Sequence, residues 1–202
     1  MINYICLKIS NYLIKEKIIT DKERNIYSYL FSCVFEEIIF DLITLATGII
    51  FHRLITSVLF IIITMPLRYF AGGYHASTPL RCTILSYGIM IIVVLFPQLS
   101  FEHSETIQAI IFFVCIAIIM IVSPVDTENK RFNISDKISL QKKARITVIL
   151  ICGIQLILWY NKSNQHTQTI TLCVLICTLS LLAGYIRLSL IHIWRCRRTL
   201  GC

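Results

Sequence analysis

Long apolar stretches recur along this chain of 202 residues, and they constrain its fold more than any other feature. Apolar residues make up 56% of the sequence and charged residues only 15%, so the mean hydropathy reaches +0.76. A soluble domain of this length could not bury so much apolar surface. A helix crosses a bilayer with about 20 mostly apolar residues, because the hydrocarbon core is about 30 Å thick. The sequence therefore predicts a membrane protein with several spanning segments.

The predicted class is an all-α polytopic membrane protein. Backbone polar groups in lipid must be satisfied within each segment, which excludes an open sheet, and the apolar runs lack the alternation of barrel strands. The second apolar stretch is short, so an alternative remains in which four segments cross and the first two enter the membrane without crossing. The main expectation is about six spans, at 29–50, 53–67, 83–101, 105–125, 144–160 and 167–188.

The lysines and arginines are distributed very unevenly between these predicted spans. Alternate connecting segments hold 17 of the 19 basic residues on one side and 2 on the other. Because cytoplasmic segments are enriched in Lys and Arg, both termini are expected in the cytoplasm, together with the stretch 68–82. No basic patch is interleaved with stacking aromatic residues outside the spans, so nucleic-acid binding is not expected.

The two ends of the chain differ from its middle. Ile2, Ile5, Ile9 and Leu13 recur at helical spacing among lysines, which predicts an amphipathic helix. This helix lies either on the membrane surface or against the bundle, and no cleavable signal peptide is evident. The final segment, 188–202, changes character abruptly and looks like translated vector sequence. A single membrane domain is therefore expected over 1–187.

A polar interruption, "PLRYFAGGYHASTPLRC", stands between two apolar runs at residues 66–82. Thr78 is a suitable N-cap and Pro79 suits the first position of a helix. Cys82 would then lie in the first turn, where free N–H groups and the helix dipole favour a thiolate. His75 precedes Cys82 by seven residues, and such a pair can act as an activated nucleophile. The alternative is an ordinary connecting loop.

The stretch "RYFAGGYHASTPLRC" resembles the signature of the accessory gene regulator B (AgrB) family. These are bacterial membrane cysteine endopeptidases that process quorum-sensing propeptides. The family pattern matches Arg68, Gly73, His75 and Cys82 in order and spacing. The Pro-containing stretch "SPVDTENKRF" and the basic residues after it also resemble the family, over about residues 1–187. The tail, 188–202, departs from it.

The resemblance implies a reaction and a set of partners. Cys82 would attack a carbonyl near the C-terminal end of a small AgrD-like propeptide, and His75 would serve as general base and then general acid. A Cys or Ser of the peptide would attack the resulting thioester and close a thiolactone or lactone ring. No cofactor or metal is implied. The protein would lie in the bacterial cell membrane, with the catalytic site on the cytoplasmic side. The resemblance also makes a homodimer plausible.

Three further side chains each allow two interpretations. Arg68 either holds the loop or an acidic propeptide segment, or it extends to lipid headgroups from the end of its span. Glu37 and Asp41 share one helix face in the first span, where charge is costly; they either orient His75 or are simply hydrated near the interface.

The competing function is a non-enzymatic membrane protein, either a small transporter or a scaffold for peptide export. In that case His75 and Cys82 would be ordinary residues of a loop and a helix start. The other cysteines lie mostly in apolar runs, and we expect Cys173 and Cys177 to pack in the core rather than to hold a metal ion.

Overall fold

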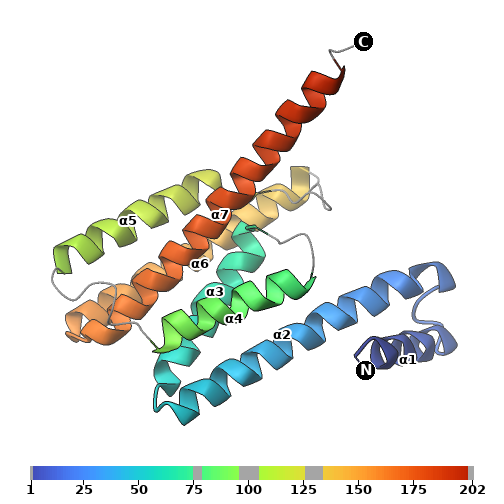
Figure 1. Cartoon of the computed structure of the whole chain (residues 1–202), viewed down its shortest axis with the longest axis horizontal. Helices are drawn as coiled ribbons and strands as arrows, with labels where there is room; N and C mark the ends of the chain where they lie inside the picture. Colours follow the sequence, from blue (N-terminus) through green and yellow to red (C-terminus); the bar gives the residue numbers. More distant parts are fainter. Residues whose placement is uncertain (1, 75–78, 96–104, 126–133, 200–202) are drawn as a thin grey trace. The chain divides into compact units, whose positions relative to one another are not determined.

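The computed structural model of the chain describes residues 2–74, 79–95, 105–125 and 134–199 (Figure 1). Over these ranges the chain forms seven α-helices and a short 3₁₀ turn, with no strand, so the all-α prediction is confirmed. The elements are α1 (Ile2–Lys15), η1 (Asp21–Glu23), α2 (Arg24–Ile50), α3 (Leu54–Ala71), α4 (Pro79–Leu95), α5 (Glu105–Val122), α6 (Ile134–Tyr160) and α7 (Asn164–Thr199).

The chain divides into two compact units, Met1–Ala46 and Thr47–Cys202, and the division falls inside α2. The first unit contains α1, which confirms the helix predicted at the N-terminus; its place on the membrane surface stays a prediction. A capping box follows α1, because Glu23 accepts hydrogen bonds from both the backbone N–H and the hydroxyl of Thr20. These bonds lower the pKa of Glu23.

Within the described ranges, four helices are long and apolar enough to cross a membrane, namely Leu54–Ala71, Glu105–Val122, Ser135–Tyr160 and Asn164–Arg187. Two of the six predicted spans fall outside this group. The first lies in α2, which carries Glu36, Glu37 and Asp41, and the other lies in α4, whose apolar part, Arg81–Leu95, is shorter. The alternative with four crossings assumed that the stretch 53–67 enters the membrane without crossing it. However, α3 covers this stretch and is one of the four helices that are long enough to cross.

Within the second unit, α7 is the central helix. It contacts α3, α4, α5 and α6, and Figure 1 shows it running between α5 and α3. Of its membrane-length window 56% is buried inside the protein, against 39% for α3 and 22% for α5 and α6. Small side chains on α7 allow this close approach. Cys173 and Cys177 are both buried there, as predicted.

A buried polar cluster joins three of these helices near the start of α7. The side-chain amide of Gln155 on α6 donates to the hydroxyl of Thr171 and to the carbonyl of Thr167, both at 3.4 Å. The amide of Gln108 on α5 donates to the same Thr171 hydroxyl at 3.3 Å. Because such groups have few other partners in lipid, these hydrogen bonds tie α5 and α6 to α7.

Replacement of Gln155 by leucine tests this cluster. Gln155→Leu removes both bonds to α7, and we expect it to lower the free energy of unfolding by about 0.5–1.5 kcal/mol, the usual contribution of hydrogen bonds between membrane helices. Reversible unfolding in mixed micelles measures this change. The matched control is Gln168→Leu at a half-buried position on α7, expected to stay within about 0.5 kcal/mol. An equal effect of the two substitutions would contradict a stabilising role of the Gln155 hydrogen bonds.

Candidate functional site

Helix α3 ends at a glycine whose backbone conformation and surroundings both exclude a side chain. Gly72 has φ +81°, and its N–H donates to the carbonyl of Arg68 at 3.2 Å. Glycine adopts this left-handed region without steric cost. A Cβ at Gly72 would lie 2.8 Å from the carbonyl oxygen of Val125. The chain therefore turns sharply at Gly72 and lies directly against the residues that follow α5.

The segment after α5 is bound to this turn by its backbone. The N–H of Val125 donates to the carbonyl of Ala71 at 3.1 Å, and both residues are buried. Val125 belongs to the Pro-containing stretch that the sequence singled out. The structure thus places the first residues of that stretch beside the end of α3, although about fifty positions separate them in the chain.

Gly73 and Tyr74 cross the surface of α7 at two small residues, Ser180 and Gly184, which we call the α7 notch. The N–H of Tyr74 donates to the carbonyl of Ser180 at 2.9 Å and to its hydroxyl at 3.2 Å. A Cβ on Gly184 would lie 3.0 Å from the carbonyl carbon of Gly73 and 3.1 Å from the nitrogen of Tyr74. A Cβ on Gly73 would lie 2.8 Å from the Ser180 hydroxyl. The two backbones therefore pack together with no space for larger residues.

The side chain of Tyr74 is also held by α7. The guanidinium carbon of Arg187 lies 5.4 Å from the centre of the Tyr74 ring, within the range of a cation–π interaction. Both the backbone and the ring of Tyr74 are thus anchored on one helix. The next residue is His75, which lies outside the described residues together with 76–78.

Cys82 lies where the sequence predicts it, in the first turn of α4. That helix begins at Pro79, and Cys82 is half-buried and forms no disulfide. Ser86 follows one turn later and so shares a helix face with Cys82. Arg68 reaches this face from α3, since its Nη1 donates to the Ser86 hydroxyl at 3.4 Å. The structure therefore brings Arg68 to the helix that carries Cys82, one turn along from the thiol.

The other residues and segments proposed from the sequence have different outcomes. Glu37 and Asp41 lie in the first compact unit and Cys82 lies in the second, so an orienting role for either acid stays a prediction. The connection predicted between the spans 105–125 and 144–160 is helical in its second part, because α6 already begins at Ile134. In the part of the chain that the structure describes, no three His, Cys, Asp or Glu side chains gather as metal ligands would.

Four residues of this site were not singled out from the sequence: Ser86, Ser180, Gly184 and Arg187. Ser180 and Gly184 are spaced as in the small-xxx-small pattern of closely packed membrane helices, and this pattern could have indicated the notch. It could not have named the partner, because the partner is a turn 106 positions earlier in the chain rather than another helix.

A model of the family described as Accessory gene regulator B matches residues 6–181. Two curated AgrB-like proteins of Clostridium perfringens are similar to the chain. The protein of strain 13 is 26% identical over 178 residues, which cover 81% of this chain and 83% of the relative. The protein of strain SM101 is 25% identical over 179 residues, which cover 81% of this chain and 84% of the relative. No solved structure matches the chain.

A methyl group at Gly184 tests the contact in the notch. Gly184→Ala forces the Gly73–Tyr74 backbone away from α7 by a few tenths of an ångström, and we expect it to lower the free energy of unfolding by about 1–3 kcal/mol. The matched control is Gly153→Ala on α6, where a Cβ meets nothing within 4 Å, so the better helix propensity of alanine is expected to raise stability by up to about 1 kcal/mol. Thermal unfolding in detergent compares the two, and equal changes would contradict the contact.

Proposed function

The chain belongs to the accessory gene regulator B family, and from this premise we propose that it is a membrane cysteine endopeptidase that matures a quorum-sensing peptide. Family membership supports a role in processing such peptides, and the four long apolar helices support a multi-pass membrane protein. One observation carries the finer proposal: the chain is anchored on α7 up to the residue immediately before His75, and Cys82 lies in the first turn of the next helix.

In the first step of the proposed reaction, the Cys82 sulfur attacks a peptide carbonyl near the C-terminal end of an AgrD-like propeptide. His75 takes the thiol proton and passes it to the leaving amine as the peptide C–N bond breaks. The products are the free propeptide tail and an acyl-enzyme in which a thioester joins the rest of the peptide to Cys82.

In the second step a Cys or Ser within the bound peptide attacks this thioester. His75 accepts its proton, the bond from the carbonyl carbon to the Cys82 sulfur breaks, and the peptide leaves as a thiolactone or lactone. Exchange of one thioester for another is close to neutral in free energy, so cleavage can drive ring closure through the shared intermediate. Water competes for the same carbonyl, and a site at the membrane edge limits its access.

The start of α4 supports this role for Cys82. Cys82 lies in the first turn of the helix, close to the positive end of the helix dipole. This end of the dipole favours the thiolate before attack and an oxyanion on the carbonyl during attack. The start of α4 thus stabilises two negative charges, first that of the thiolate and then that of the oxyanion.

The α7 notch and Arg68 support the geometry of the proposed site. A catalytic group must be held to within about 0.5 Å of its working position, and the two hydrogen bonds from the Tyr74 N–H fix the point from which His75 extends. Arg68, bonded to Ser86, holds α3 against α4 and places a positive charge one turn from Cys82. We propose that this charge also meets an acidic segment of the propeptide. The cytoplasmic placement of the site and a homodimer stay predictions.

Mass spectrometry of the propeptide tests the reaction. The wild-type protein, co-expressed with a candidate AgrD-like propeptide, is expected to release the tail and a cyclised peptide. Cys82→Ser should abolish release, because the serine hydroxyl is a far weaker nucleophile than a thiolate, and His75→Ala should slow it by about 10²–10⁴-fold. The control is Cys33→Ser, which changes an exposed cysteine of α2 and should leave processing unchanged.

Membrane levels of each variant are measured in parallel, so that loss of protein is not read as loss of catalysis. Continued processing by both Cys82→Ser and His75→Ala at normal levels would contradict the enzyme and favour the scaffold or transporter.

A further inference from the structure

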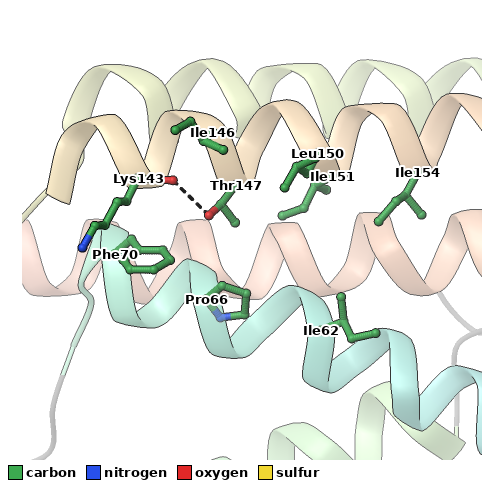
Figure 2. Close-up of a pocket in the computed structure, with 9 residues that line it drawn as sticks. All are labelled: Ile62, Pro66, Phe70, Lys143, Ile146, Thr147, Leu150, Ile151 and Ile154. Atoms are coloured by element: carbon green, nitrogen blue, oxygen red, sulfur yellow. Dashed lines mark hydrogen bonds between the residues drawn. The ribbon is translucent and has the colours of Figure 1, made fainter. Parts of the chain in front are cut away.

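A groove of about 490 Å³ lies between α3 and α6 (Figure 2). Ile62, Pro66 and Phe70 line it from successive turns of α3, and Lys143, Thr147 and Ile151 line it from α6. Thr147 and Ile151 are buried and form the floor, whereas Ile62 is exposed and forms part of a wall. The groove is therefore an open channel along two membrane helices rather than an enclosed cavity.

The lining is apolar along its whole length except at one end. The Thr147 hydroxyl donates to the carbonyl of Lys143 at 3.0 Å, so it is already satisfied within its own helix. Lys143 lies at the Phe70 end, with its ammonium nitrogen 5.9 Å from the centre of the Phe70 ring. Lys142 and Arg145 adjoin it in sequence on α6. One end of the groove is thus positively charged, and the rest offers only hydrocarbon.

The length of the groove matches one leaflet of a bilayer. Ile62 to Phe70 spans about 12 Å along α3, and Lys143 to Ile154 spans about 16 Å along α6, at 1.5 Å per residue. Half of a hydrocarbon core about 30 Å thick is about 15 Å. The charged end lies where headgroups would be, and the uneven distribution of Lys and Arg predicts that this is the cytoplasmic side.

The volume of the groove favours a thin ligand over a peptide helix. A helix about 10 Å wide that rises 1.5 Å per residue occupies roughly 120 Å³ per residue, so the groove would hold only about one turn of a peptide helix. One extended hydrocarbon chain suits both its length and its lining. A positive charge at the headgroup end then favours a lipid with net negative charge over a zwitterionic one.

We propose that this groove binds one acyl chain of an anionic phospholipid whose phosphate pairs with the ammonium group of Lys143. The site is independent of the proposed catalysis, because none of its lining residues takes part in that reaction. It adjoins the motif, however, since Phe70 lies in the last turn of α3, two residues before Gly72.

Native mass spectrometry of the full chain tests the site. The protein is released from bilayers of equal parts phosphatidylglycerol and phosphatidylcholine, and the retained lipids are counted. The wild type is expected to keep one phosphatidylglycerol. Lys143→Gln should lower its retention about fivefold, the contribution of one lysine beside an anionic lipid. Lys137→Gln, at an exposed lysine of α6 outside the groove, should keep the wild-type value.

A second pair of variants tests the hydrocarbon part without changing charge. Ile62→Trp fills the groove and is expected to remove the retained lipid, whereas Ile55→Trp, at an exposed position of α3 outside the groove, should keep it. Thermal unfolding of each variant shows that it is folded. Unchanged retention in both Lys143→Gln and Ile62→Trp would overturn the proposal.

Two further results would also overturn it. One is displacement of the lipid by inorganic phosphate alone, which would make Lys143 a simple anion site. The other is loss of propeptide binding in Ile62→Trp with phosphatidylglycerol retention unchanged, which would assign the groove to the peptide. Failure of propeptide processing in the wild type leaves this proposal standing, because lipid retention is measured without substrate.

Discussion

The contact of Gly73 and Tyr74 with the α7 notch is the interaction on which the rest of the site depends. It joins the turn after α3 to the most buried helix of the second unit through two hydrogen bonds from one N–H group. The absence of a side chain at Gly184 permits the approach, and Gly72 supplies the turn that directs the chain there. This contact fixes the backbone of Tyr74, the last described residue before α4.

Helix α7 combines two polar contacts at opposite ends of its buried part. Near its start, Thr167 and Thr171 accept hydrogen bonds from Gln155 and Gln108, which fasten α5 and α6 to it. Thirteen residues after Thr167, Ser180 accepts the hydrogen bonds from Tyr74. In lipid, where hydrophobic attraction between helices is weak, such polar and small-residue contacts determine which helices pack together. The helix that organises the bundle is therefore also the helix that supports the candidate site.

Hydropathy predicted the class of the fold and located α3, α5, α6 and α7, because crossing a bilayer demands long apolar segments. It placed the start of α6 about ten residues too late, since lysine and arginine read as loop residues although both are good helix formers. Pro79 was predicted at the first position of a helix, and α4 does begin there, with Cys82 in its first turn. Thr78, the predicted N-cap, lies outside the described residues. The notch could not be derived in this way, because it pairs residues far apart in the chain through their backbones, and neither hydropathy nor spacing encodes that pairing.

The most direct test of this arrangement is hydrogen exchange at the amide of Tyr74, measured by solid-state NMR on the protein in lipid bilayers. Its N–H donates to two acceptors on a buried helix, so exchange should be slowed at least about tenfold relative to an open loop, toward the rates of α7. Exchange of the Tyr74 amide at the rate of an unprotected loop would contradict the docking of this segment on α7, and with it the proposed basis for holding His75.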